Sequence, residues 1–478
     1  MKFKFILPAL TEAESPFWRP IKYSLFPPLG LATLAAFLSP DDEAEIVDQH
    51  VQVLSLDDTP DVVAIQVYIT NAYRAYEIAD AYRAKGTCVI LGGLHVTSLP
   101  EEAEQHADAI FLGPGEDSFK RFLNDFRKGE FRKQNIGKGQ AAKRYGSQIR
   151  TLSGLPPIRR DLIERRLYLV PNSIVVTRGC PHHCEFCYKD AFFQGGKSFY
   201  TQQVEHALAE IERLPGRHLY FLDDHLLGHK SFARNLFNGM RGMERVFQGA
   251  ATVDSILDGD LIEKAAQAGM RSVFVGFESL DPRNLLQSNK RQNLSRDYAR
   301  VTDRLHDLGI MINGSFVFGL DGDDPTVFKR TVEWAVERGI TTATFHIATP
   351  YPGTAFHAAM RDAGRMASQD WDLFDTRHVT FRPANMTAEQ LRSGYDQAYR
   401  DFYTWSSIFK ASLFHGTMKH QLKHFFYASG WKKFEPLWNM IIQLKRLGLM
   451  TPMLEAVLSR VTRQENDAAL ECPVEEAS

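Results

Sequence analysis

The chain has 478 residues, of which 44% are hydrophobic and 24% charged, and its formal net charge at pH 7 is −2. This length allows two or three domains with their own cores, and the near-zero charge excludes the general attraction to nucleic acid of a strongly basic protein. Five cysteines are too few for a disulfide framework, and no apolar run reaches the ~18 residues of a membrane span. We therefore expect a cytoplasmic protein with reduced thiols.

The first 130 residues alternate strand-like and helix-like patterns, as in a doubly wound, Rossmann-like sheet. Strands are expected at 2–7, 45–48, 62–67, 88–91 and 109–112, and helices at 29–38 and 72–84. Ligands of such sheets bind beyond the carboxyl ends of the strands, where glycines let the backbone approach closely. The candidates there are Thr70, Asn71, Gly92, Gly93, His95, Gly113, Gly115 and Glu116. Ordinary turn chemistry is the alternative interpretation of the same loops.

The rest of the chain divides by pattern into four parts. Residues 131–170 are basic and weakly patterned, which indicates a linker. Residues 171–385 alternate strand and helix again and predict a partial TIM-like (β/α) barrel, whose chemistry would gather at the carboxyl ends of its strands. Residues 386–463 have a helical pattern, and 464–478 are predicted to be a disordered tail. The expected fold class is α/β, with an α-helical C-terminal domain.

The most informative motif is a C-x3-C-x2-C run formed by Cys180, Cys184 and Cys187, with Phe186 directly before the third cysteine. A strand at 172–177 would deliver this loop at its carboxyl end. Three thiolates can hold three irons of a [4Fe–4S] cluster and leave the fourth iron open for another ligand. The alternative is a zinc site completed by His182 or His183.

The cysteine run resembles the signature loop of the radical S-adenosylmethionine (SAM) superfamily. Residues 3–130, with the stretches 27–32 and 92–95, resemble the cobalamin-binding domain that precedes many cores of this family. The resemblance implies that SAM chelates the fourth iron and that the reduced cluster cleaves SAM to a 5'-deoxyadenosyl radical. Some cobalamin domains supply a histidine to cobalt after the first strand, but residues 8–13 contain none. His50 follows the second strand, and we interpret its Asp-x-His spacing as coincidence.

The resemblance also implies contacts for SAM in the barrel. Asp223 or Asp224 would recognise the amino group of SAM, with helix capping as the alternative role. Glu278 and Ser279 would contact the ribose or the methionine part.

Further along the chain, the strand with Gly314 and Phe316 would lie under adenine, according to the same resemblance. The stretch Asn289-Lys290-Arg291 could provide a cation near the SAM carboxylate or the substrate, although a solvated surface pair is an equal alternative. His346 is a candidate for substrate or proton handling, although most single histidines are satisfied core residues.

The resulting functional hypothesis is a radical SAM enzyme that functionalises an unactivated carbon, with cobalamin-dependent C-methylation as the main interpretation. The alternatives are cobalamin-independent oxidation, cyclisation or rearrangement, and a non-catalytic zinc or Fe–S binding protein. The expected partners are a small-molecule or lipid-like substrate and an electron donor such as flavodoxin or ferredoxin, with no nucleic acid. Aromatic and basic residues between 395 and 463 could contact a membrane surface or form a lid, but packing of the aromatics onto the barrel is the simpler interpretation.

Overall fold

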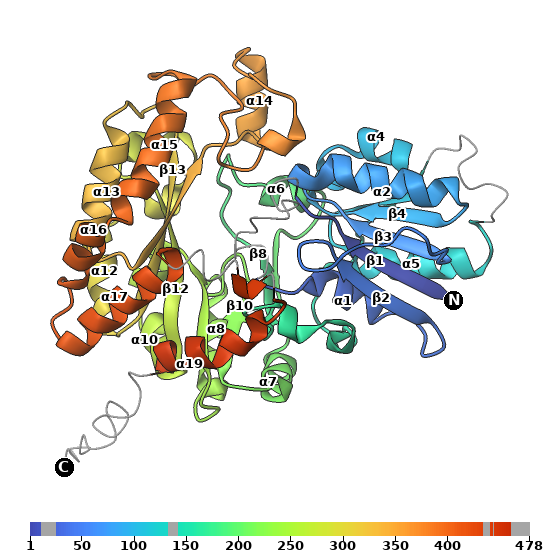
Figure 1. Ribbon diagram of the computed structural model, residues 1–478, viewed down its shortest axis with the longest axis horizontal. Coiled ribbons are helices and arrows are strands. Elements are labelled where there is room, and N and C mark those ends of the chain that lie inside the picture. The colour runs from blue at the N-terminus through green and yellow to red at the C-terminus, as the bar shows by residue number, and fades with distance from the viewer. Residues whose placement is uncertain (11–24, 132–141, 434–439, 443, 460–478) are drawn as a thin grey trace.

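The computed structural model describes residues 1–10, 25–131, 142–433, 440–442 and 444–459 (Figure 1). The predicted tail at 464–478 therefore lies outside the described residues. Two parallel six-stranded sheets stand in separate lobes, with the N-terminal lobe in blue and the second lobe in green to red (Figure 1). This arrangement confirms the predicted order of a Rossmann-like domain followed by a partial barrel.

The first sheet has the order β2-β1-β3-β4-β5-β6, in which the chain reverses direction across the sheet next to β1. Alternate residues of these apolar strands face two helical layers, so each face of the sheet has its own core. The strands are β1 (Lys2–Leu7), β2 (Glu43–Asp48), β3 (Val62–Gln66), β4 (Cys88–Gly92), β5 (Ala109–Leu112) and β6 (Lys143–Gly146). The main helices are α1 (Leu29–Ala35), α2 (Ala72–Ala84) and α5 (Gly115–Arg127).

The linker prediction for 131–170 is wrong in part, because β6 lies inside it and closes the first sheet. β6 pairs with β5 along its four residues. Its anchor is Tyr145, a buried residue whose ring stacks on Phe111 with centroids 5.4 Å apart. One buried residue in four gives no recognisable strand pattern in the sequence.

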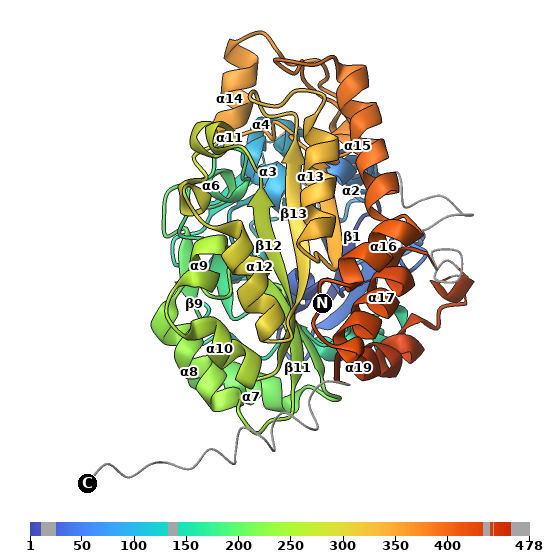
Figure 2. The same ribbon diagram turned by 90° about the vertical axis from the view of Figure 1, so that its left-hand side faces the viewer.

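The second sheet has the order β14-β13-β12-β11-β10-β7 and forms the open barrel. Its helices cover the outer face, and the largest core of the molecule lies between the two layers (Figure 2). The strands are β7 (Ser173–Ile174), β10 (His218–Phe221), β11 (Val246–Ala251), β12 (Met270–Glu278), β13 (Met311–Phe318) and β14 (Thr342–Ile347). The longer outer helices are α7 (Val204–Arg213), α8 (Lys230–Met240), α10 (Leu261–Gln267), α12 (Tyr298–Asp307), α13 (Val327–Glu337) and α14 (Ala355–Asp362).

The strand expected at 172–177 is split in two. After β7 the chain leaves the barrel sheet, and β8 (Thr177–Gly179) instead pairs antiparallel with β9 (Phe199–Thr201). The reason is Asp223, whose carboxylate accepts hydrogen bonds from the amides of Val176, at 3.1 Å, and of Thr177. This side chain takes the place of a neighbouring strand.

The C-terminal part of the chain is helical, as predicted; its first helix packs beside β14, and its last lies against β10 and β11. They are α15 (Ala388–Phe402), α16 (Trp405–Ser412), α17 (Met418–Lys432) and α19 (Thr451–Ser459). The hydroxyl of Tyr403 lies 3.1 Å from both the amide and the carbonyl of Ala343, and Tyr399 accepts from the amide of Phe345 at 3.1 Å. These tyrosines satisfy the edge of the barrel sheet, which supports the packing interpretation for the aromatics of α15. Within the described parts of the chain, no helix combines the length and apolar character needed to cross a membrane.

Candidate functional site

The three cysteines share the loop between β8 and the short helix α6 (Lys189–Phe192). Burial raises the pKa of Cys180 to about 11 and that of Cys187 to about 12, so both thiols are protonated at neutral pH until a metal displaces the proton. The sulfur of buried Cys184 accepts a hydrogen bond from the amide of Gln292 at 3.3 Å. Three sulfur donors on one loop, with half-buried Phe186 among them, fit three corners of a four-iron cluster.

The two histidines of this loop have other partners. The ring of His182 packs against that of His225, with centroids 5.7 Å apart, and His183 lies 3.1 Å from the carboxylate of Asp190. In the described residues, no three His, Cys, Asp or Glu side chains form a site for a single metal ion. Both histidines are thus engaged with side chains other than the cysteines.

Asp224 holds both ends of the cysteine loop. Its carboxylate accepts hydrogen bonds from the amide of Gly179, just before the first cysteine, and from the hydroxyl of Tyr188, just after the third, each at 3.0 Å. The negative charge of Asp224 and burial together raise the pKa of Tyr188, so its hydroxyl stays a donor. The adjacent Asp223 is 3% exposed and bound to backbone amides, so it is a structural residue, and only Asp224 stays a candidate for the expected SAM contact.

A buried ion pair stands beside the cysteines. Glu278, at the carboxyl end of β12, adopts φ +64°, and its carboxylate lies 2.8 Å from the ammonium of Lys290. Burial alone would lower the pKa of Lys290, but Glu278 and the nearby Cys184 and Cys187 raise it above its ordinary value. Lys290 is therefore a permanent cation next to the cluster loop, and the surface-pair alternative is wrong. Ser279 accepts hydrogen bonds from Asp281 and Asn284, which leaves its own proton for a ligand.

The expected adenine contacts on β13 are wrong for Gly314 and Phe316. The Phe316 side chain is fully buried in the core behind the sheet, where its ring stacks on Phe277 with centroids 5.6 Å apart. A Cβ at Gly314 would point the same way, toward Phe316 and Ile340. The opposite face carries His346 of β14, whose ring lies 3.1 Å from the hydroxyl of Thr376.

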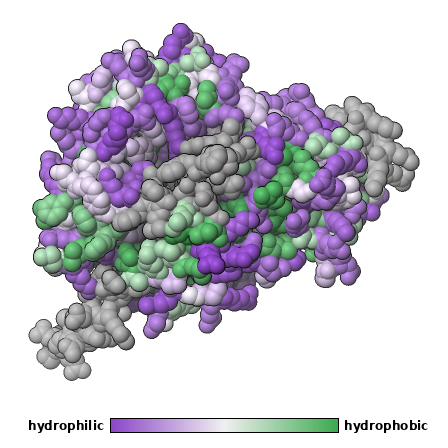
Figure 3. All heavy atoms as spheres, in the orientation of Figure 1, coloured by the Kyte–Doolittle hydropathy of each residue, from purple (hydrophilic) through white to green (hydrophobic). Residues whose placement is uncertain are grey.

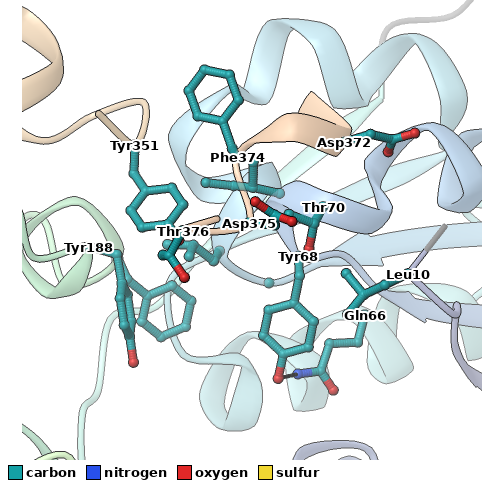
Figure 4. Close-up of a pocket in the computed structure, with 14 residues that line it drawn as sticks. Leu10, Gln66, Tyr68, Thr70, Tyr188, Tyr351, Asp372, Phe374, Asp375 and Thr376 are labelled. Carbon is teal, nitrogen blue, oxygen red and sulfur yellow. Dashed lines mark hydrogen bonds between the residues drawn. The ribbon is translucent and has the colours of Figure 1, made fainter. Parts of the chain in front are cut away.

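A cavity of about 520 Å³ opens where the two lobes meet (Figure 4). The first lobe contributes loops after its strands, with Tyr68, Thr70 and Gly93, and the second lobe contributes Tyr188 and Phe192 from the region just after the cysteines. The remaining wall comes from the segment after the barrel, with Tyr351, Asp372, Phe374, Asp375 and Thr376. Figure 4 shows the rings of Tyr68 and Tyr188 on opposite sides of this space, with Tyr68 bonded to Gln66 at 2.9 Å.

A second, narrower cavity of about 210 Å³ continues into the first lobe and shares Gln66, Gly93 and Phe192 with the first cavity. Its lining is dominated by small and apolar residues, among them Gly30, Ala64, Gly92, Gly113 and Gly115. A Cβ at Gly93, where φ is +120°, would clash with the carbonyl oxygen of Val67 at 2.6 Å, and one at Gly113, where φ is +77°, would make a tight contact of 3.2 Å with that of Phe192.

Cobalamin is a broad corrin ring with an extended nucleotide tail. The wide cavity suits the ring, and the narrow glycine-lined cavity suits the tail, so the residues present fit this cofactor. Those that would hold it are Thr70, Gly92, Gly93, Gly113 and Gly115.

Three polar residues of the first lobe do not face these cavities. The amide of Asn71 donates to the carbonyl of Pro8 at 2.9 Å, and the ring of His95 bonds to Glu102 at 2.8 Å with no exposed surface. The expected ligand contacts of Asn71 and His95 are therefore wrong. His50 is buried, and its Nδ1 lies 2.7 Å from the carboxylate of Asp48.

Glu116 lines the narrow cavity, but its carboxylate is paired with Arg178, which sequence reasoning missed. Arg178 lies on β8, two residues before Cys180, so this half-buried pair joins α5 of the first lobe directly to the cysteine loop. The sequence signal that could have identified Arg178 is its position two residues before the first cysteine of the motif. Its partner, 62 residues earlier, could not be identified from spacing.

Two family models match the chain, the radical SAM superfamily over residues 174–335 and the B12 binding domain over residues 23–123. Bacteriochlorophyllide d C-12(1)-methyltransferase of Chlorobaculum tepidum is 29% identical over 362 residues, which cover 73% of this chain and 76% of that protein. Hopanoid C-2 methylase of Rhodopseudomonas palustris is 22% identical over 360 residues, 73% of this chain and 66% of that protein.

The fold is similar to that of a radical SAM methyltransferase, TsrM from Kitasatospora setae, solved with cobalamin and a [4Fe–4S] cluster. The TM-score is 0.62 at 14% identity, over 95% of this chain and 99% of the other. The two family matches follow each other along the chain in the order of the two lobes. The chain therefore belongs to the radical SAM superfamily, among the members that carry a B12-binding domain before the radical SAM core.

Proposed function

We propose that this protein methylates an unactivated carbon of a small hydrophobic molecule in a cobalamin-dependent radical SAM reaction. The observation that carries the proposal is the shared cavity. Loops of the B12-binding lobe and residues directly after the cysteine loop line the same space. Cobalamin bound to the first lobe would thus lie next to the radical that forms at the second lobe.

In this proposal each cofactor has its own residues. When bound, the reduced [4Fe–4S] cluster and SAM supply the radical that removes a hydrogen atom from the substrate, and cobalamin supplies the methyl group. Cys180, Cys184 and Cys187 bind the cluster, and Asp224 fixes the shape of their loop from both ends. Lys290 offsets the negative charge of the thiolates, while Glu278 holds its ammonium in place.

The partners follow from the lining of the cavity and from the relatives. Two relatives are named for a bacteriochlorophyllide and a hopanoid. Aromatic walls at Tyr68, Tyr188 and Tyr351 suit a substrate of that class, a tetrapyrrole or an isoprenoid lipid. The electron would come from a small redox protein such as flavodoxin or ferredoxin in the cytoplasm, and contact with a membrane surface would give access to apolar substrates.

The test uses protein purified without oxygen, reconstituted with iron and sulfide, and supplied with hydroxocobalamin, a strong reductant and SAM labelled in its methyl group. An organic extract of the host cells serves as the acceptor pool. Deoxyadenosine together with labelled extract products, both dependent on cobalamin, is the expected result. Deoxyadenosine without cobalamin dependence would favour the oxidation or cyclisation alternative. The absence of both products would overturn the proposal.

A further inference from the structure

Helices α16 and α17 expose an apolar face that packing among the described residues does not explain. Its members recur at every fourth residue, so each set lies along one side of its helix. They are Trp405, Phe409 and Leu413 from α16 and its end, and Met418, Leu422 and Phe426 from α17, all between 48% and 70% exposed. We call these six residues the α16–α17 face. Figure 3 shows hydrophobic residues gathered at the left edge, where Figure 1 places these two helices.

The two helices form one continuous surface. The ring of Trp405 stacks on that of Phe425, with centroids 5.9 Å apart, and the ammonium of Lys433 lies 5.4 Å from the centroid of the Trp405 ring. The opposite sides of the helices are buried against the protein, through Ile408 on α16 and Ala428 on α17. The exposed face is thus the outer side of the two helices, and contiguous exposed apolar surface often marks an interaction site.

The charged residues of these two helices are all basic. Residues 405–433 contain five lysines and no aspartate or glutamate. Lys419 stands next to Met418 on α17, and Lys433 falls seven residues after Phe426, on the same side of the helix. The nearest acidic partner on a neighbouring helix is Glu337 of α13, 3.5 Å from Lys410.

We propose that the α16–α17 face docks the protein onto the surface of a membrane that contains anionic lipid. Large apolar side chains would enter the boundary between headgroups and acyl chains, while lysines reach the phosphates around them. A second copy of the chain is the less suitable occupant, since a two-fold pairing would bring lysines against lysines. The inference goes beyond the proposed function and holds whatever the reaction is.

The experiment measures cosedimentation of the full-length, cluster-reconstituted protein with two kinds of vesicles. One is pure phosphatidylcholine, and the other contains about 30% phosphatidylglycerol. The disruptive variant is Phe409→Asp/Phe426→Asp, and the matched control is Val53→Ser/Ile149→Ser, which changes two exposed apolar residues elsewhere, 88% and 63% exposed. Size-exclusion chromatography and thermal melting establish that each variant is folded.

We expect the native protein and the control to bind the anionic vesicles, and the disruptive variant to lose at least about tenfold in partitioning. Lys419→Glu/Lys433→Glu should lose affinity for anionic vesicles only, and high salt should have the same effect on the native protein. Absence of binding by the native protein, or equal binding by all variants, would overturn the proposal. A concentration-dependent dimer that Phe409→Asp/Phe426→Asp abolishes, without vesicle binding, would assign the face to a second copy and overturn it as well.

Discussion

Replacing Lys290 by methionine should cost the protein much of its stability and its cluster, because the substitution leaves Glu278 buried without a cation. The two side chains are 8% and 11% exposed, with Nζ and Oε1 2.8 Å apart. At that separation two unit charges attract by about 6 kcal/mol at an effective dielectric constant of about 20, and desolvation offsets part of this. Breaking such a pair from one side typically costs about 3–5 kcal/mol.

The assay is a double-mutant cycle with Lys290→Met, Glu278→Gln and the combined variant. Urea unfolding of the cluster-free proteins gives the free energy of unfolding, and iron and sulfide analysis after reconstitution gives the cluster content. The combined variant should be more stable than Lys290→Met alone, since its buried partner is neutral. Lys329→Met is the control, because its pair with Glu333 is 82% and 58% exposed and should contribute under about 0.5 kcal/mol.

Two results would refute this reasoning about the buried pair. One is a Lys290→Met protein within about 0.5 kcal/mol of the native protein with a full cluster. The other is a combined variant whose loss equals the sum of the two single losses, since additivity means that the two charges do not interact.

Three further predictions concern separate parts of the chain. Gly93→Val should abolish corrinoid binding while the cluster content stays normal, because its Cβ would meet the Val67 carbonyl at 2.6 Å. The control Gly146→Ala, which has open space around it, should bind the corrinoid normally. Equal binding by both variants in equilibrium dialysis would contradict this prediction. Asp224→Ala should reduce cluster content after reconstitution, since two hydrogen bonds that shape the loop disappear, and a full complement of iron would show that the loop needs no such support. Burial lowers the pKa of His424 well below its ordinary value, so the stability that depends on this residue should be present above pH ~6.5 and be lost progressively as the pH falls below it. A urea midpoint equally pH-dependent in His424→Gln would contradict the assignment.

The fold is predictable from the sequence where it depends on residues close together in the chain. The cysteine loop and the glycine turns of the first lobe depend on residues a few positions apart, and strands such as 88–92 and 109–112 are continuous apolar runs. Phe316 shows where such reasoning stops. Both faces of β13 are buried, so an unbroken apolar strand gives no indication of which residues face the ligand and which face the helices.

Long-range partners account for the other differences. Nothing in the order Asp223-Asp224 tells which acid is buried, because the answer depends on backbone amides 46 and 47 residues earlier in the chain. The position of His95 in a loop after a strand predicts a ligand contact, but the fold places Glu102 and Trp371 against its ring. The α16–α17 face is a similar case, since only the packing of α16 on α13 shows which aromatics remain outside.

The central claim is that the cluster and cobalamin occupy one shared space between the two lobes. The most direct measurement is the electron paramagnetic resonance spectrum of cob(II)alamin bound to the reconstituted protein, recorded with the cluster oxidised and with it reduced. Because both centres are paramagnetic in the second case, we predict that reduction broadens the cobalt signal in the native protein and leaves it unchanged in Cys184→Ala, which should lack the cluster. A cobalt spectrum that is identical in both states of the native protein, with cluster and corrinoid both bound, would contradict the shared site.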